Sequence, residues 1–473
     1  MPIRRKLNNL DASYKVSTGN KITRTITDFL NTEYREYSNY VISTRALPSL
    51  WDGMKVGGRK ILYSAFVGGL KDGSEKKLLN LIGDVYNKTL YAHGDASLIG
   101  ASLTLGSYYS DNLNPIEIVG QGGSLRNSQA AAARYLYCKL SKYAKLLYKV
   151  DEDLLQYVFD EGEYLEPEHF LPIIPLVLTA RTEGLAPGYK FSSFSYNPID
   201  IIDGCTEVIK NGHLEKTIIR PYVRGIKQDK FGFDKDSNKW YNVGEWSIDE
   251  KNDILRITDL PYDVQFDKFE KKLNSYIENG YIKEWKNFSH DNDLDYRILF
   301  DKSKLAREAQ PDKKEQLLKK FMLQTNIPND LLYVLDENKK VKHFQTKEDL
   351  LEHFVKIRLE KYNDRKDRLV SVKEKQLEEN SNLCKFIELV TSGKLVLNNR
   401  KMADVKKDLD AHKLPYNVLT IQVSKLTQEE KEEILKKNKE IEQELEYIKN
   451  TTIEQMYLDD LKNLKKELIK DFE

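Results

Sequence analysis

The amino-acid sequence predicts a multidomain α+β fold that ends in a long antiparallel coiled coil. Its 473 residues are enough for several domains, and 40% hydrophobic with 32% charged residues is a composition of globular proteins. Between about residues 200 and 300, β-branched and aromatic residues alternate with polar ones, as in strands. After about residue 345 the apolar residues take helical spacing almost to the end.

The N-terminal third predicts several short helices. Residues 25–44 have the apolar spacing of one helix, and residues 52–67 that of a turn leading into a second. We expect a third helix to begin near His93, with Asp95 or Ser97 as its N-cap. Short helices with basic residues at their starts are typical of a helix-turn-helix unit.

The middle of the chain predicts a separate mixed α+β module. Its apolar residues alternate with polar ones over short stretches, which is the pattern of half-buried strands. The four stretches expected to be strands are TIIRPYVRGI (217–226), KWYNVGEWSI (239–248), DILRITDLP (253–261) and LDYRILF (294–300).

The C-terminal region predicts two long helices separated by a small globular piece, residues 392–417. Thr346 with Asp349, and Thr427 with Glu430, have the spacing of capping residues at the start of each helix. An antiparallel coiled-coil arm with a head at its tip is predicted, and a plain helical bundle is the alternative that the heptads leave open. The heptad a and d positions of the second helix hold Ile434, Asn438, Ile441, Leu445 and Ile448, with Asn438 as the polar exception.

The net charge of +1 conceals an uneven distribution. Residues 1–150 carry 21 Lys and Arg against 11 Asp and Glu, a surplus of ten, so the remainder has a net charge of −9. Residues 426–473 hold nine lysines against fourteen acidic residues. A polyanion-binding N-terminal part is therefore predicted, with an acidic region kept away from it.

Several classes of protein and of site are excluded by missing patterns. No apolar run is long enough for a membrane span, and no apolar stretch follows the basic start as in a signal peptide. Cys138, Cys205 and Cys384 lie far apart, which fits the reducing cytoplasm and argues against disulfides and a cysteine zinc site. Without a GxxxxGK[ST] or an HExxH pattern, we expect neither a P-loop nor a metal site in this chain.

Polar functional groups are concentrated in three segments. They are RALPSLWDGMKVGGRKILYSAF (45–66), YAHGDASL (91–98) and GQGGSLRNSQAAAARYLYCKLS (120–141). In the last, a run of mostly small residues leads to Arg134 and Tyr135 and would let a DNA backbone approach closely. A tyrosine is more often a packing residue, and this chain has 28, so the residues alone leave both roles of Tyr135 open.

These segments resemble the winged-helix cleavage domain of type IIA DNA topoisomerases. Members carry RALP..DGLKP..R(R/K)ILY, Y(H/A)HG(D/E)..L, DGQGN.G and AA..RYT in this order, and a fourth segment (171–198) is similar to their IPxxLxNGxxGIxxGxxTxIPPxNP. The layout resembles the medium subunit of T-even-like bacteriophage enzymes. The resemblance implies a basic N-terminal arm (1–27), a winged-helix cleavage domain (28–165), an α/β tower domain (166–345) and a coiled-coil arm with a helical C-terminal dimer gate (346–473).

The resemblance also implies the catalytic groups. Tyr135 is expected to attack a DNA phosphorus and form a phosphotyrosyl ester. A phenol is a weak nucleophile unless positive charge lies nearby, and the guanidinium of Arg134 fits the oxygens of a five-coordinate phosphate. Arg45 is expected to act likewise, and His93 to hydrogen-bond the reacting phosphate.

DNA-binding residues are expected on two elements. Lys55, Arg59 and Lys60 cluster at the start of one helix, where cations are suited to backbone phosphates. Leu185 stands where the family has a DNA-intercalating isoleucine and is expected to wedge between bases, with burial in the core as the competing interpretation. This leucine, together with VGQGG in place of DGQGN, leaves the DNA-site preference and bend geometry open.

The family's ATPase domain and Toprim acidic motif have no counterpart in the sequence. We therefore expect a separate subunit to bind the Mg²⁺ and hydrolyse the ATP, within an A2B2-type heterotetramer. The chain is expected to act on double-stranded DNA as a homodimer in the cytoplasm, the host's if phage-encoded, without a membrane. Relaxation and decatenation are expected, but not negative supercoiling, because the gyrase wrapping domain is missing.

Three alternatives compete with this interpretation. A tyrosine recombinase needs an HxxR pattern, which none of the seven histidines provides. A DNA-binding scaffold of the same fold has no need for Arg45, His93, Arg134 and Tyr135 together. A truncated single-chain topoisomerase is the third, although the sequence carries no remnant of a Toprim domain.

Overall fold

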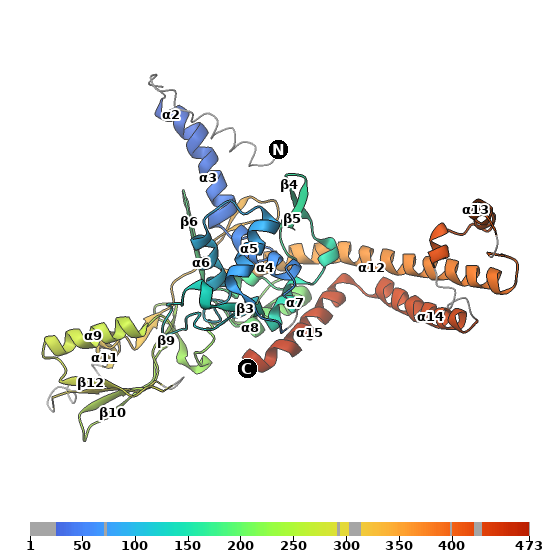
Figure 1. Cartoon of the computed structure of the whole chain (residues 1–473). Helices are drawn as coiled ribbons and strands as arrows, with labels where there is room; N and C mark the ends of the chain where they lie inside the picture. Colours follow the sequence, from blue (N-terminus) through green and yellow to red (C-terminus); the bar gives the residue numbers. More distant parts are fainter. Residues whose placement is uncertain are drawn as a thin grey trace. The chain divides into compact units, whose positions relative to one another are not determined.

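The computed structural model describes residues 25–70, 73–290, 294–301, 314–397, 400–420 and 428–472 (Figure 1). Two units can be distinguished: one contains the chain up to Val355 and from Leu461 onward, and the other spans Lys356–Asp460. Mixed helices and sheets with one 45-residue helix confirm the predicted α+β class. The predicted domain boundaries stay predictions, because this division separates only the arm, and most of the N-terminal segment 1–27 lies outside the described residues.

The first helical run is continuous from Ile26 to Ala46 and includes two π-helical turns. Thr25 caps it, because its hydroxyl accepts a hydrogen bond from the Asp28 backbone N–H at 3.1 Å. The helix predicted over 25–44 is confirmed, although its π-helical turns were not predicted. Its parts are α2 (Ile26–Phe29), η1 (Leu30–Tyr34), α3 (Arg35–Val41) and η2 (Ile42–Ala46).

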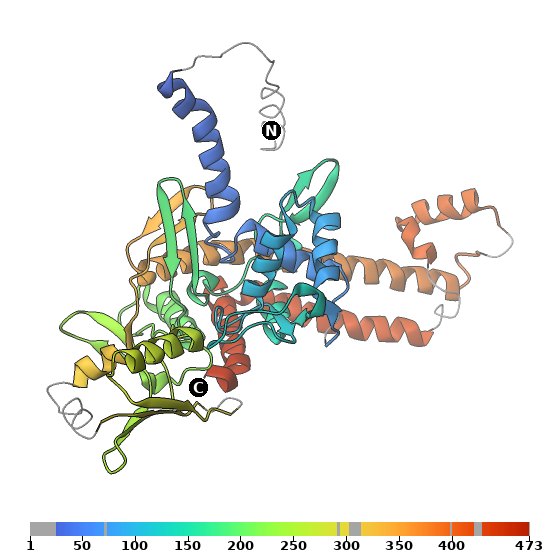
Figure 2. The same ribbon diagram turned by 60° about the vertical axis from the view of Figure 1, so that its left-hand side comes forward.

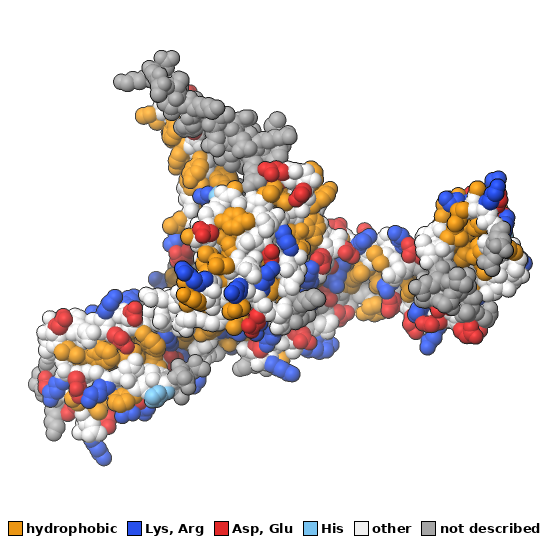
Figure 3. Space-filling model, viewed as in Figure 1, with side chains coloured by type: hydrophobic (Ala, Val, Ile, Leu, Met, Phe, Trp, Pro, Cys, Tyr) orange, Lys and Arg blue, Asp and Glu red, His pale blue; other side chains and the backbone are white. Residues whose placement is uncertain are grey.

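Hydrophobic side chains remain uncovered along this first helix. Figure 3, in the orientation of Figure 1, shows orange side chains along the surface of this helix. Residues three and four apart lie on one side of a helix, so these side chains form a stripe. The exposed members are Ile26, Phe29, Leu30, Tyr34 and Tyr37.

Four helices and a small antiparallel sheet form the winged-helix part. The sheet has the order β1-β3-β2, so the last strand lies in the centre. The helix predicted near His93 begins at Asp95, and its N-cap is Gly94. The predicted capping by Asp95 or Ser97 is wrong. The Asp95 carboxylate accepts a hydrogen bond only from the adjacent Ala96 N–H, at 2.9 Å. The elements are α4 (Val56–Val67), β1 (Lys76–Lys77), α5 (Leu78–Thr89), α6 (Asp95–Leu105), β2 (Ile116–Val119), β3 (Tyr137–Leu140) and α7 (Lys142–Tyr148).

Two hairpins and a helix link this part to the next. In both ribbon views the hairpin β6–β7 runs beside the base of the first helical run (Figures 1 and 2). Its outer end carries the turn between Ala186 and Tyr189. The elements are β4 (Tyr157–Asp160), β5 (Glu163–Pro167), β6 (Thr182–Ala186), β7 (Tyr189–Ser193) and α8 (Pro198–Asn211).

The middle region folds around a four-stranded sheet of order β10-β11-β13-β12 and its helices. Three of the four predicted stretches contain strands. The stretch 217–226 does not: its Arg220 N–H donates to the Asp200 carboxylate at 3.0 Å, and Pro221 has no N–H for a ladder. The elements are β8 (Phe231–Asp234), β9 (Lys239–Val243), β10 (Trp246–Asp249), β11 (Ile254–Ile257), α9 (Phe266–Glu278), β12 (Glu284–Asn287), β13 (Tyr296–Leu299), α11 (Lys314–Lys320), β14 (Gln324–Asn326), β15 (Leu332–Leu335) and β16 (Val341–Phe344).

The arm is an antiparallel pair of helices, α12 (Lys347–Thr391) and α14 (Gln428–Asn450), as predicted. The amide of Asn380 donates to the side-chain oxygen of Asn438 at 2.8 Å, so the polar heptad position has a polar partner. The predicted a and d residues of α14 are its less exposed ones. A separate cluster forms the head with α13 (Met402–Ala411): Phe386, Leu389, Leu395, Val405, Leu409, Leu414 and Val418.

Capping and the chain end complete the fold. Thr346 and Asp349 exchange two hydrogen bonds of 3.1 Å, which confirms the first capping box, whereas Thr427 of the second lies outside the described residues. The last helix, α15 (Ile453–Phe472), crosses the unit boundary, and from Leu461 onward it belongs to the first unit.

Within the described residues, no helix has the length and apolar character to span a membrane.

Candidate active site

Tyr135 ends a short 3-10 turn, η3 (Ala133–Tyr135), directly before the central strand β3. Buried Leu136 and Cys138 anchor the strand, and the alternation of side chains turns Tyr135 outward, where it is 69% exposed. Its backbone N–H donates to the Ala132 carbonyl at 2.9 Å. Tyr135 is therefore not a packing residue, and its hydroxyl is open to a ligand.

Arg134 lies beside Tyr135 and is also exposed. Its guanidinium carbon is 5.8 Å from the centroid of the Tyr135 ring, so a positive charge lies near the phenol. The glycine-rich segment before the turn supports this arrangement. Gln121 accepts a hydrogen bond from the Ala131 N–H at 2.8 Å, and Gly123 has φ +91°, with no room for a side chain beside the Ser128 carbonyl.

Arg45 and His93, predicted from distant segments, are in contact. Arg45 Nη2 lies 3.0 Å from His93 Nδ1, and the Arg45 side chain is exposed. Two tyrosines that the sequence did not single out hold this histidine. The Tyr40 hydroxyl lies 2.8 Å from His93 Nε2, and the Tyr86 hydroxyl donates to the His93 carbonyl at 2.8 Å.

Lys55 precedes helix α4 and contacts the β6–β7 hairpin. Its Nζ donates to the Glu183 carbonyl at 2.7 Å, and burial lowers its pKa. An ammonium has three donors, so this contact leaves others for a phosphate. The structure thus adds an anchoring role to the predicted phosphate contact, which stays a prediction.

Arg59 and Lys60 are placed differently from the prediction. Arg59 is 5% exposed and forms a bidentate ion pair with Asp52, from Nε at 2.7 Å and from Nη2 at 3.0 Å. Lys60 Nζ lies 2.7 Å from the Glu166 carboxylate and 2.6 Å from the Thr89 carbonyl. Phosphate contact by these two side chains does not fit the structure, because both are committed to buried partners inside the fold.

Leu185 lies on β6, opposite Lys190 in the hairpin, and is 73% exposed. This exposure rules out the competing interpretation of a core leucine. The hairpin is mounted by a close backbone contact: a Cβ on Gly184 would lie 1.9 Å from the Ala46 carbonyl oxygen, so only glycine fits there. Ala46 directly follows Arg45, so the hairpin and the Arg45–His93 pair share one support.

A sequence model of the A subunits of DNA gyrase/topoisomerase IV matches residues 45–465. The chain belongs to this family. The matched region contains every predicted site residue, from Arg45 to Leu185. The fold described above is also the fold of a type II topoisomerase cleavage domain.

Similar proteins agree with this membership. DNA topoisomerase 2, mitochondrial, of Dictyostelium discoideum is 32% identical over 392 residues, covering 82% of this chain and 30% of that protein. DNA topoisomerase 2 of Plasmodium falciparum is 29% identical, covering 92% and 34%. The chain therefore spans about a third of the length of these curated relatives.

A solved structure covers almost the whole fold. It is described as the Plasmodium falciparum topoisomerase II DNA-binding, cleavage and re-ligation domain, and it matches 98% of this chain and 70% of its own with a TM-score of 0.83 at 27% identity. The likeness extends over both units, each of which thus has a counterpart in a type II topoisomerase.

Metal binding was not expected in this family member. Within the described residues, no three His, Cys, Asp or Glu side chains are grouped as they would be around a metal ion. The expectation that a partner subunit holds the Mg²⁺ stays a prediction.

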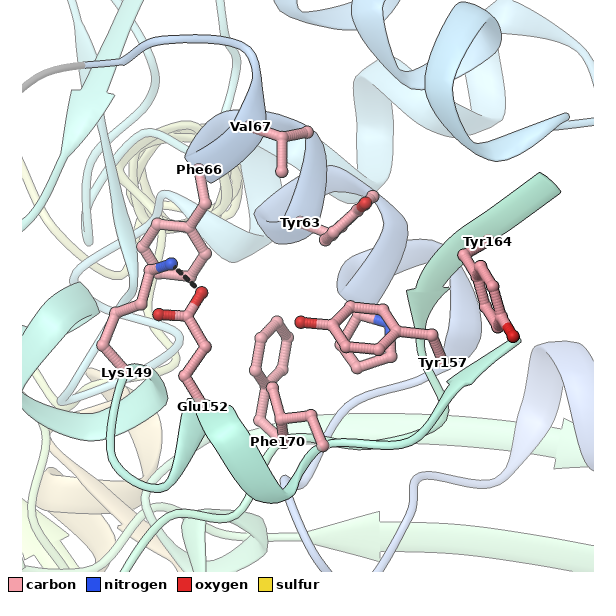
Figure 4. Close-up of a pocket in the computed structure, with 10 residues that line it drawn as sticks. Tyr63, Phe66, Val67, Lys149, Glu152, Tyr157, Tyr164 and Phe170 are labelled. Atoms are coloured by element: carbon pink, nitrogen blue, oxygen red, sulfur yellow. Dashed lines mark hydrogen bonds and ion pairs between the residues drawn. The ribbon is translucent and has the colours of Figure 1, made fainter. Parts of the chain in front are cut away.

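A pocket of about 230 Å³ lies between the end of α4 and the β4–β5 hairpin (Figure 4). Lys149 and Glu152 form an ion pair at its side, and Lys149 Nζ lies 4.6 Å from the Phe66 ring centroid. None of the predicted site residues lines it. Half of its lining residues are aromatic: Tyr63, Phe66, Tyr157, Tyr164 and Phe170.

Proposed function

We propose that this chain breaks and rejoins duplex DNA as the cleavage part of a type IIA topoisomerase, with Tyr135 as the nucleophile. The proposal depends on one observation: Tyr135 is exposed in the turn before strand β3, and Arg134 lies beside it. Both residues lie in the region that matches the family. The similar solved domain is described as one for DNA binding, cleavage and re-ligation, and we extend that activity to this chain.

The reaction is a transesterification. The Tyr135 oxygen attacks phosphorus, the bond to the 3′ oxygen breaks, and a 5′-phosphotyrosyl ester forms. The phenol proton leaves, and the departing 3′ oxygen takes up a proton. Because one phosphoester replaces another, the reverse reaction rejoins the strand without ATP. Arg134 and Arg45 stabilise the charge on the five-coordinate phosphate, and His93 donates a hydrogen bond to it.

DNA bending accompanies cleavage in this proposal. An exposed leucine on a rigid hairpin has the form of the apolar wedges that other proteins insert between base pairs. Leu185 supplies the wedge, and Lys55 at the foot of the hairpin supplies a phosphate contact. Arg59 and Lys60 have no part in it.

The remaining functions of the enzyme are assigned to a partner. We infer that a separate Toprim and ATPase subunit binds the Mg²⁺ and hydrolyses the ATP, in an A2B2-type complex with two copies of this chain. Two copies place two tyrosines on the two DNA strands and permit strand passage, relaxation and decatenation. We place the complex in the cytoplasm, because all three cysteines are unpaired and buried. A phage origin rests on the resemblance in layout alone.

Trapping the covalent adduct tests the nucleophile. The chain is incubated with a Toprim-bearing subunit, supercoiled DNA and magnesium, and the reaction is stopped with detergent. Wild type is expected to give protein–DNA adducts, and Tyr135→Phe none, while its DNA affinity stays the same. Tyr137→Phe is the matched control, because Tyr137 is an exposed tyrosine two residues further on.

Two results would contradict the proposal. Adducts formed by Tyr135→Phe would move the nucleophile to another residue. DNA binding without any adduct from the wild-type complex would make the chain a non-catalytic DNA-binding protein of the same fold.

A further inference from the structure

Tyr40 touches both members of the Arg45–His93 pair. Its hydroxyl lies 2.8 Å from His93 Nε2, and the guanidinium carbon of Arg45 lies 5.4 Å from the centroid of its ring. Arg45 Nη2 in turn lies 3.0 Å from His93 Nδ1. Each of the three side chains therefore contacts the other two.

A π-helical turn makes this arrangement possible. In an α-helix, residues five apart point about 140° away from each other around the axis. Between Tyr40 and Arg45 the helix changes to the π turn η2, in which the Leu47 N–H bonds to the Ile42 carbonyl at 3.3 Å. The wider turn brings Arg45 round toward the side of Tyr40.

Tyr40 and Arg45 both hold the His93 ring. A guanidinium has donors but no acceptor, so Arg45 can only donate to the ring, and its Nη2 lies 3.0 Å from Nδ1 and 3.5 Å from Nε2. The Tyr40 hydroxyl can donate to Nε2 or accept from it, so its contact fixes the orientation of the ring in either tautomer.

We propose that Tyr40 is a positioning residue for DNA cleavage, which rests on the function proposed above. Its hydroxyl holds the His93 ring in one orientation, and its ring holds the Arg45 guanidinium beside that histidine. The two groups expected on the reacting phosphate are thus pre-arranged before DNA binds, which is the condition for electrostatic stabilisation of a transition state. Tyr40 acts through these two residues and needs no contact with DNA.

Two substitutions separate the hydroxyl from the ring. Tyr40→Phe keeps the ring under Arg45 and removes the bond to His93, so single-turnover adduct formation is expected to slow roughly five- to tenfold at unchanged DNA affinity. Tyr40→Leu removes both contacts and is expected to be slower still. Tyr37→Phe is the matched control, because Tyr37 is an exposed tyrosine on the same helix, and it is expected to react at the wild-type rate.

A double-mutant cycle tells positioning from a general structural effect. In a His93→Ala chain, Tyr40→Phe is expected to cause no further loss, because the hydroxyl acts through the missing imidazole. An equal loss in both backgrounds, or a wild-type rate for Tyr40→Phe, would overturn the proposal. Failure of the proposed function is recognised separately, since the wild-type complex would then form no adducts at all.

Discussion

Arg59→Met is expected to destabilise the fold and to leave the DNA contacts of the chain unchanged. Both side chains of the Arg59–Asp52 ion pair are almost fully shielded, at 6% and 0% exposed. The Asp52 carboxylate also accepts the backbone N–H groups of Met54 and Phe170, each at 3.0 Å. The Arg59–Asp52 pair therefore joins α4 to the turn before it and to the segment at Phe170.

The size of the effect follows from the burial. Methionine has a similar length but no charge, so the variant leaves the Asp52 carboxylate in the interior with only its backbone donors. Removing one partner of a buried pair costs about 3–5 kcal/mol. At about 2 °C per kcal/mol for a unit of this size, the unfolding midpoint is expected to fall by roughly 6–10 °C. Asp52→Leu in the Arg59→Met chain is expected to recover part of this loss, because the unpaired charge is gone.

Thermal unfolding and salt-dependent DNA binding together decide the point. The slope of log K against log salt is expected to be the same for Arg59→Met and wild type, because Arg59 reaches no phosphate. Lys55→Met is the control with the opposite pattern: it is expected to keep most of the stability and to lower the slope by about 0.9, the share of one phosphate contact. An Arg59→Met protein with wild-type stability and a lower slope would refute this reasoning.

Three other substitutions have defined outcomes. Burial raises the pKa of Asp111 to about 6, so between about pH 4 and pH 6 the folded state binds a proton that the unfolded state has lost. The free energy of unfolding is therefore expected to fall as the pH rises through this range. In urea titrations at several pH values, Asp111→Asn is expected not to show this fall. Leu185→Ala is expected to reduce DNA bending, measured by energy transfer between labelled DNA ends, with less than about 0.5 kcal/mol change in stability because the side chain is exposed. Asn438→Leu leaves Asn380 without its partner and is expected to destabilise the arm by about 1–2 kcal/mol, whereas leucine at both positions is expected to restore melting by circular dichroism.

Periodicity and motif order were sufficient for much of the fold. The helices over 25–44 and 52–67, the Thr346–Asp349 cap and the antiparallel arm followed from local patterns, which depend on neighbours three and four residues away. Motif order also brought Arg45 and His93 into one site, although 48 residues separate them. The π turns could not be predicted, because one extra residue in a turn leaves the composition of a helix unchanged.

The role of the cations at the start of α4 could not be inferred from the sequence. Arg59 and Lys60 stand beside Lys55, and a cluster of positive charge is typical of a phosphate site. Asp52 neutralises Arg59 and Glu166 neutralises Lys60. These acidic partners lie 7 and 106 residues away in the sequence, so only the tertiary fold shows that the two cations are paired. The exposure of Leu185 could not be predicted either, because the register of a strand decides whether a residue faces the core or the solvent.

Bending and cleavage share one support in this fold. The β6–β7 hairpin contacts the π turn that carries Arg45 through the close backbone approach at Gly184, and it contacts the start of α4 through the Lys55 bond to the Glu183 carbonyl. In the proposed function, a base step in contact with Leu185 would press on the residue next to Gly184, which lies against the carbonyl of Ala46 beside Arg45. Because packed backbones transmit small displacements, we expect from the proposed function that DNA which the wedge does not bend is also less well aligned with the Arg45 guanidinium. We therefore infer that the shape of the DNA, read as its ease of bending, influences the chemistry at its phosphate.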